Sequence, residues 1–330
     1  MIHRIVNSSG IISLAILVIS AILLWSRVFI AKEHIVLPCA ASPLYNLVYL
    51  SIGGFKIISA FVCIAMIILT AIVVNFVLAG YDLIPRSSYI AAYIFVLITA
   101  IFSDFILLSP FIFVGIILII LSWQLFGLYD KSSSLSLVFN MGFLVSVASM
   151  FYFPCILFLL WIWITFLIYR IFLWRSWFIS IIGFGLPYLF LSSWYFVNGN
   201  LGDKLSVYLN ALQFIDLSGL APDLFVWIVI AILGALSLIS AARFLKISNE
   251  RPIKIRKFLA VMIWFYIIVL FCVMISANYF TFGAGLLLLP LTLMIPVFLS
   301  SLKRKVITDW IFLLLLFLVI SERLGLWDML

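Results

Sequence analysis

Long apolar runs separated by short polar connections dominate the chain. A helix needs about 20 apolar residues to cross the hydrocarbon core of a bilayer, and runs of about that length recur from residue 10 to residue 324. They lack the apolar–polar alternation of membrane-barrel strands, and backbone groups in lipid must be satisfied internally. The pattern predicts an all-α, polytopic transmembrane bundle with about eleven spans. The expected segments are 10–30, 57–80, 88–106, 110–128, 135–152, 154–170, 177–197, 224–244, 258–276, 282–300 and 307–324.

Two of the apolar runs are too long to be single helices. Residues 88–128 hold one charge, Asp104, and as one helix they would measure about 60 Å, twice the thickness of a bilayer core. Residues 135–170 pose the same problem. Proline is favourable at the start of a helix and costly inside one. We therefore expect turns at Leu108-Ser109-Pro110 and at Phe153-Pro154.

Composition supports the membrane class. Of the 330 residues, 68% are hydrophobic and 9% are charged, against about 25% charged in ordinary soluble domains. A soluble globular domain and a disordered chain are both excluded. The first apolar run is longer than the apolar region of a signal peptide and no A-x-A site follows it, so we expect a retained first helix. Residues 1–330 are predicted to form a single integral membrane domain.

The charges predict an orientation. The formal net charge is +8, and the basic residues lie in short connections, which favours topology over a nucleic-acid partner. With the N-terminus in the cytoplasm, 14 of the 19 Lys and Arg residues fall in cytoplasmic connections and five on the outer side. This asymmetry is the positive-inside rule. The densest cluster, Arg243–Lys257, is interpreted as a topology anchor in contact with anionic lipid, with partner docking as the alternative.

Two outer connections are long, Ala31–Lys56 and Asn198–Asp223. Each contains a short amphipathic stretch, Pro43–Ile52 and Leu205–Ile215, of the kind that lies in the membrane interface. Long ordered connections usually carry function. Any site is therefore expected on the outer face.

Glu33 and Asp104 are the candidate catalytic residues. Glu33 follows the first segment, and Asp104 lies near the outer end of the third. A carboxylate close to hydrocarbon is costly and tends to be functional. A pair of them suits general-base activation of an acceptor hydroxyl or binding of a divalent cation. The alternative is that Glu33 is a solvated loop residue and that Asp104 marks the interface.

Basic residues on the outer side are few. They could bind a lipid-linked phosphate at the membrane surface, and the alternative is that their side chains snorkel at helix ends. Within the membrane, glycines such as Gly142 and Gly183 permit close helix packing. The candidate lipid-phosphate ligands are Arg27, Lys32, His34, Lys56 and Lys204.

Three runs stand out in the middle third of the chain: LIPRSSYIAAYIFVL (83–97), FNMGFLVSVASMFYFP (139–154) and YRIFLWRSWFISIIGFGLPY (169–188). They resemble an uncharacterised family of bacterial inner-membrane proteins. The resemblance implies a multi-pass protein of the bacterial inner membrane and no particular activity.

The layout as a whole resembles the GT-C glycosyltransferases, which use polyprenyl-phosphate sugars. The shared features are a first outer loop with an acid and interfacial helices, an acid at the outer end of the third helix, and a later long outer loop. In that superfamily the first-loop acid serves as base or metal ligand and the second acid assists, which implies these roles for Glu33 and Asp104. This chain has no Asp-Glu pair in its first loop.

Three functions stay open at this stage. The first is a GT-C-like transferase that takes sugar from a polyprenyl-phosphate carrier at the outer face of the membrane. The second is a non-catalytic membrane subunit of an envelope or secretion assembly, with a partner in a membrane complex. The third is a lipid or solute carrier, which needs a polar cavity through the midplane.

Overall fold

The computed structural model describes residues 10–26, 35–36, 41–101, 107–130, 134–210, 224–247, 252–275, 280–302 and 305–323. These residues are almost entirely helical. Each of the eleven predicted apolar segments overlaps a described helix, and residues 27–30, 102–106, 276 and 324 of those segments lie outside the described part. The helices are α2 (Gly10–Trp25), α4 (Lys56–Gly80), α5 (Ile90–Ile101), α6 (Pro110–Leu128), α7 (Leu135–Phe151), α8 (Phe158–Tyr169), α9 (Trp174–Val197), α11 (Leu224–Ile247), α12 (Ile253–Met274), α13 (Phe280–Ser301) and α14 (Lys305–Arg323).

Both predicted breaks are confirmed. Helix α6 begins at Pro110, directly after Ser109 in extended conformation. Helix α7 ends at Phe151 and is followed by the short 3-10 helix η3 (Phe153–Leu157). Proline at the first helical position costs nothing because its missing N–H would be unpaired there anyway.

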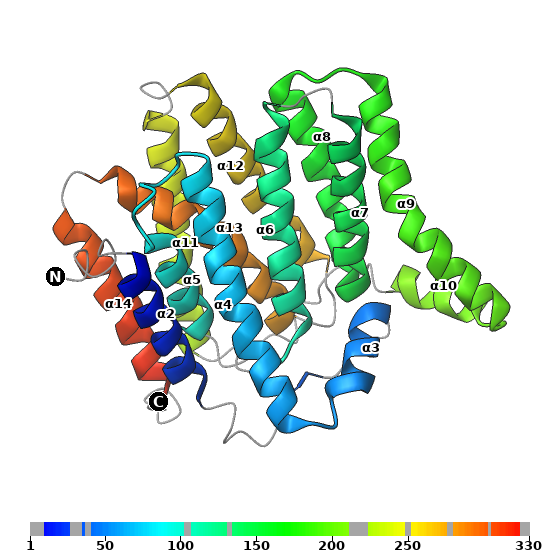
Figure 1. The fold of residues 1–330 in the computed structure, drawn as a ribbon, viewed down its shortest axis with the longest axis horizontal. Helices are drawn as coiled ribbons and strands as arrows, with labels where there is room; N and C mark the ends of the chain where they lie inside the picture. The colour runs from blue at the N-terminus through cyan, green and yellow to red at the C-terminus, as the bar shows by residue number, and fades with distance from the viewer. Residues whose placement is uncertain are drawn as a thin grey trace.

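Two short helices complete the fold. Helix α3 spans Pro43–Ile52, as predicted. Helix α10 spans Leu201–Asn210, four residues earlier than expected, and residues 211–215 of that prediction lie outside the described part. Figure 1 shows α3 and α10 at the same end of the bundle, which we call the α3 end.

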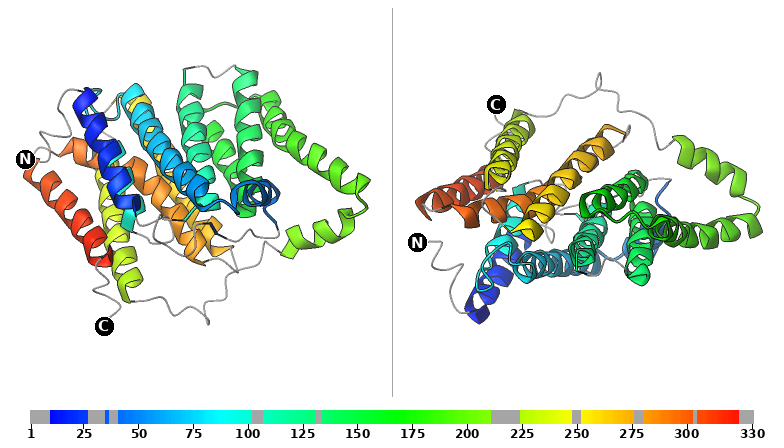
Figure 2. Two further views of the ribbon diagram at one scale, coloured as in Figure 1. Left: turned by 60° about the horizontal axis from the view of Figure 1, so that its bottom comes forward. Right: turned by 90° about the horizontal axis from the view of Figure 1, so that it is seen from above.

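The long helices form a bundle in which consecutive members run in opposite directions (Figure 1). Viewed from above in Figure 2, α2, α4, α6 and α7 form one row, and α14, α13, α12 and α8 form a second row behind it. Helix α5 packs against α4 in the first row and against α13 and α14 in the second. The lower half of α9 leans away from the bundle, and α10 folds back from its end (Figures 1 and 2).

The described helices resemble those of a membrane protein in length and composition. In the described part, four helices are long and apolar enough to cross a bilayer: α4, α6, α9 and α12. Shorter apolar helices lie between them, for example Ile90–Ile101 and Leu135–Phe151. Large apolar side chains such as Phe190 and Phe317 are exposed on the outside of the bundle, as expected for a surface that meets lipid tails.

The end of the bundle opposite α3, which we call the basic end, carries most of the described charge. It contains the connections after α4, α6 and α8 and the start of α12. At the α3 end the described basic residues are Lys56, Lys204 and Arg323. At the basic end they are Arg86, Arg170, Arg175, Arg243, Lys246, Lys254, Arg256, Lys257 and Lys305.

Candidate functional site

A buried tyrosine joins two distant connections at the α3 end. Tyr45, in α3, is fully buried. Its hydroxyl oxygen lies 2.7 Å from the carbonyl oxygen of Val36 and 2.8 Å from that of Leu108. The backbone N–H of Val36 donates to the same Leu108 carbonyl at 3.0 Å, and Ile35 forms an isolated parallel β-bridge with Leu108. We call this arrangement the Tyr45 junction.

The Tyr45 junction provides hydrogen-bond donors for the backbone carbonyls of Val36 and Leu108. Val36 and Leu108 do not belong to a helix. Their carbonyl oxygens therefore need hydrogen-bond donors from elsewhere in the chain. Burial raises the pKa of the Tyr45 phenol well above its usual range, because ionisation would place a charge in an apolar surrounding. The hydroxyl therefore stays protonated and remains a donor at physiological pH.

Each predicted catalytic carboxylate lies a few residues before a residue of this junction in the sequence. Glu33 is two residues before Ile35, and Asp104 is four residues before Leu108. Glu33 and Asp104 themselves lie outside the described residues, as do Arg27, Lys32 and His34. What the structure brings together is the described ends of the two segments that carry the acids.

Two of the predicted phosphate ligands are described. Lys56 is the first residue of α4 and is half-buried at the α3 end. Lys204 lies on α10, and its Nζ atom sits 5.9 Å from the centre of the Tyr195 ring. That distance is within the range of a cation–π interaction.

Lys204 lines a cavity of about 480 Å³ between α9 and α10, a volume within the range of small-molecule sites. We call it the α9–α10 groove. Its other lining residues are Gly185, Tyr188, Leu189, Leu191, Ser192, Tyr195, Leu201 and Tyr208. The walls are thus leucine and tyrosine, with a single ammonium group among the described lining residues.

A glycine crossing sets the position of α9. A Cβ atom added at Gly183 would lie 2.3 Å from the carbonyl oxygen of Phe139, and one added at Gly142 would lie 2.1 Å from that of Ser180. Only glycine allows backbones to approach so closely, which confirms the close packing predicted at these two positions. One turn further along α9, the Tyr188 hydroxyl hydrogen-bonds the Ser149 hydroxyl of α7 at 2.8 Å.

The far side of the groove is held by an aromatic contact. The ring centre of Tyr208, on α10, lies 5.0 Å from the ring centre of Phe153, the first residue of η3. Burial raises the pKa of the Tyr208 phenol, and the neighbouring Tyr195 hydroxyl raises it further. The groove thus presents neutral hydroxyls beside the Lys204 ammonium.

At the basic end, lysines from α12 meet tyrosines and one carboxylate. Lys254 donates to both carboxylate oxygens of Asp130, the shorter distance being 2.7 Å. The Lys257 Nζ atom lies 5.1 Å from the ring centre of Tyr129 and 5.8 Å from that of Tyr169. This part of the predicted Arg243–Lys257 anchor is therefore attached to α6 and α8.

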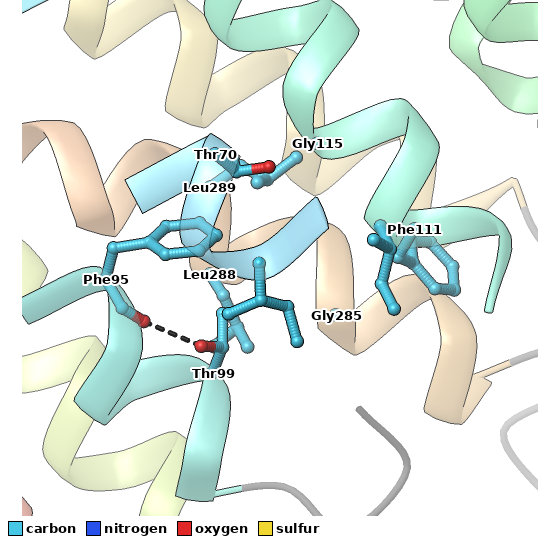
Figure 3. A pocket seen from close by; sticks show the side chains of 10 residues that line it. Thr70, Phe95, Thr99, Phe111, Gly115, Gly285, Leu288 and Leu289 are labelled. Atoms are coloured by element: carbon cyan, nitrogen blue, oxygen red, sulfur yellow. Dashed lines mark hydrogen bonds between the residues drawn. The ribbon is translucent and has the colours of Figure 1, made fainter. Parts of the chain in front are cut away.

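One cavity among the described central helices is small. The cavity in Figure 3 is about 20 Å³ and lies among α4, α5, α6 and α13. Among its described lining residues, Thr70 and Thr99 carry the side-chain hydroxyls, and both donate to backbone carbonyls of their own helices. Such a volume holds about one water molecule.

The described residues contain no group of three or more His, Cys, Asp or Glu side chains placed to hold a metal ion. The pair that would coordinate the expected divalent cation, Glu33 and Asp104, lies outside this part of the chain.

Sequence reasoning missed both the Tyr45 hydroxyl and the tyrosines of the groove. Tyr45 falls in the stretch predicted as an interfacial helix, where a tyrosine is ordinary. The available signal was its position in the first long outer connection, 12 residues after Glu33. Tyr188 and Tyr195 recur at a seven-residue spacing on one face of α9, which indicates a shared surface.

Compared with known proteins, the chain matches no protein-family model, no curated protein and no solved structure.

Proposed function

We propose that this chain is a multi-pass protein of the bacterial inner membrane that acts as a GT-C-like sugar transferase at its α3 end. The transmembrane part of the proposal has eleven spans with the N-terminus in the cytoplasm. It is supported by the overlap of all eleven predicted segments with described helices and by the excess of described lysine and arginine at the basic end. Positive residues remain on the cytoplasmic side of a membrane protein, so the α3 end faces outward.

The Tyr45 junction is the observation that carries the catalytic part. It ties the connection after the first span to the connection after the third span. A two-carboxylate site built from Glu33 and Asp104 needs these same connections to meet, and the spacing of two and four residues leaves both acids within a few residues of the tie.

The chemistry follows from the residue types. One carboxylate would take the proton from an acceptor hydroxyl as that oxygen attacks the sugar. A divalent cation, if the second carboxylate binds one, would neutralise the lipid phosphate that leaves. The first-loop cations Arg27, Lys32, His34 and Lys56 would hold that phosphate, whereas Lys204 lines the α9–α10 groove.

The test is a transfer assay with the purified protein in liposomes, using a panel of polyprenyl-monophosphate-linked hexoses. Glu33→Gln and Asp104→Asn are expected to lower transfer by about a hundredfold or more while the thermal melting temperature stays unchanged. Asp203→Asn is the matched control, because Asp203 is an exposed acid on α10 at the same end. Full transfer by both variants overturns the enzyme proposal.

A non-catalytic subunit is the second candidate, and one observation favours it. Only 17% of the most apolar stretch of α9 is buried, against 44% in α4, 61% in α6 and 50% in α12. A partner helix would find that face available. Purification in mild detergent distinguishes the two functions, since a stoichiometric partner protein supports the subunit and transfer by the isolated chain supports the enzyme.

The carrier is the weakest of the three. A carrier needs polar groups that line a path through the midplane. The central cavity of Figure 3 has room for about one water, and its two threonine hydroxyls are already bonded. These observations favour the transferase and the subunit.

A further inference from the structure

The α9–α10 groove is not fully enclosed by the described residues. Helix α9 packs on the bundle through the Gly183 crossing and the Tyr188–Ser149 hydrogen bond. Beyond Tyr188 it leaves the bundle, and Phe190, Trp194 and Phe196 are each at least 67% exposed. Helix α10 contacts η3 of the bundle through the Tyr208–Phe153 ring pair, and the Tyr208 ring also lies beside that of Tyr188.

The groove combines one positive charge with apolar walls. Lys204 is half-buried at its rim, over the Tyr195 ring. It belongs to none of the ion pairs of the described residues. Leu189, Leu191 and Leu201 line the rest, and the described lining residues include no carboxylate.

We propose that the α9–α10 groove binds one anionic diacyl phospholipid of the surrounding bilayer, with its phosphate at Lys204 and its acyl chains along α9. The charge selects a phosphate, because an ammonium at the membrane surface attracts anionic headgroups. Among the described lining residues no carboxylate is available to pair with the ammonium of a zwitterionic headgroup, which favours a net-negative headgroup. The apolar walls and the exposed face of α9 select a membrane lipid over a soluble anion.

The bound lipid would also stabilise the position of α10 relative to α9. The described contacts of α10 include Tyr208 with Phe153 and Tyr188, and Lys204 with Tyr195. A lipid that touches both α9 and α10 would add to these contacts and stabilise the arrangement of the two helices by binding the folded form. This proposal does not depend on transferase activity, since it concerns a lipid of the bilayer and a site on other elements than the Tyr45 junction.

Native mass spectrometry of the detergent-purified full chain tests the proposal. The protein is titrated in separate samples with dioleoyl phosphatidylglycerol, dioleoyl phosphatidylcholine, dioleoylglycerol, a polyprenyl monophosphate and inorganic phosphate. We expect one tightly bound phosphatidylglycerol, about tenfold weaker phosphatidylcholine, and no retained dioleoylglycerol or inorganic phosphate. Equal retention of phosphatidylglycerol and dioleoylglycerol overturns the role of the phosphate. Tighter binding of the polyprenyl monophosphate overturns the choice of occupant.

Two variants remove the site in different ways. Lys204→Met removes the charge and keeps the side-chain length, and we expect about tenfold weaker phosphatidylglycerol binding. Gly185→Leu fills the groove with apolar bulk where a Cβ meets no atom within 4 Å, and we expect loss of the bound lipid with Lys204 intact. Wild-type affinity in both variants overturns the proposal.

The controls keep charge and position apart. Lys204→Arg is expected to retain binding within about twofold. Arg86→Met removes an exposed cation far from the groove in sequence, and Ser206→Ala changes an exposed α10 residue that does not line it. Both are expected to bind phosphatidylglycerol like the wild type. A tenfold loss in Arg86→Met would show that the effect reflects the overall charge of the protein, which also overturns the site.

Discussion

The hydroxyl of Tyr45 lies 2.8 Å from the carbonyl oxygen of Leu108, 63 residues further along the chain. This contact links the first long connection to the turn before α6, and the Val36 N–H of the same connection donates to the same Leu108 carbonyl oxygen. The buried Tyr45 side chain and this backbone hydrogen bond together connect the two segments that carry the candidate acids. The junction is the first place where the structure can be tested by substitution.

Replacing Tyr45 with phenylalanine removes the hydroxyl and leaves its partner carbonyls without this donor. We expect the free energy of unfolding to fall by about 1–3 kcal/mol, the range for an unsatisfied buried polar group. Tyr49→Phe is the control on the same helix, because Tyr49 is half-exposed, and its expected loss is below about 0.5 kcal/mol. Thermal melting in detergent measures both. Equal losses in the two variants would show that the junction adds no particular stability.

The junction also predicts a response to alkaline pH. The pKa of Tyr45 is raised in the folded chain by burial, whereas the unfolded chain titrates near about 10. Its contribution to stability is therefore complete below about pH 10 and is lost as the pH rises toward the folded-state pKa. Above pH 10 the wild type should lose up to about 1.4 kcal/mol per pH unit from this residue. Tyr45→Phe should show a correspondingly smaller slope in unfolding measured from pH 8 to pH 11, and parallel slopes would contradict this assignment.

The sequence predicted the elements of this fold more completely than the contacts between them. Pro110 and Pro154 marked real helix boundaries, because proline acts on its own local backbone. Helix ends differed by a few residues where charged residues such as Arg175 and Lys254 continue a helix beyond its apolar part. The long apolar segments could be predicted from hydropathy along the chain, without knowledge of tertiary contacts.

The site was less predictable for a physical reason. The Tyr45 hydroxyl contacts the carbonyl oxygens of Val36 and Leu108. No periodic pattern in the sequence marks these contacts. The α9–α10 groove exists because α9 leaves the bundle beyond Tyr188, an angle that hydropathy does not encode. Lys204 could be singled out as a rare outer cation, but its cavity depends on how two helices diverge.

Helix α9 is positioned by glycine, and this can be tested with two neighbours on the same helix. Gly183→Ala places a methyl group 2.3 Å from the Phe139 carbonyl oxygen, so the helices must separate. We expect a loss of about 1–3 kcal/mol, typical of overpacking. Gly185→Ala meets no atom within 4 Å and is expected to be neutral or to stabilise by up to about 1 kcal/mol. Chemical denaturation in mixed micelles measures the difference, and a reversed order would overturn the proposed crossing.

The Lys254–Asp130 ion pair is expected to contribute little to stability. Its side chains are 40% and 50% exposed, and exposed pairs contribute about 0–1 kcal/mol. Asp130→Asn should therefore change the melting temperature by no more than a few degrees, with a smaller change at high salt because ions screen the pair. A large loss that persists in 1 M salt would contradict this expectation and indicate a buried role for Asp130.

The two ends of the bundle should lie on opposite sides of the membrane. Ser51 is exposed at the end of α3, and Ser87 is exposed in the connection between α4 and α5. In a background with Cys39→Ser, single Ser51→Cys and Ser87→Cys variants are treated in intact cells with a membrane-impermeant thiol reagent. The described native cysteines Cys63, Cys155 and Cys272 are buried, so the background signal should be low. We expect labelling of Ser51→Cys in intact cells, and of Ser87→Cys only after the membrane is permeabilised. Labelling of both in intact cells would place the α3 end and the basic end on one face, and an outward transferase site at the Tyr45 junction would then be untenable.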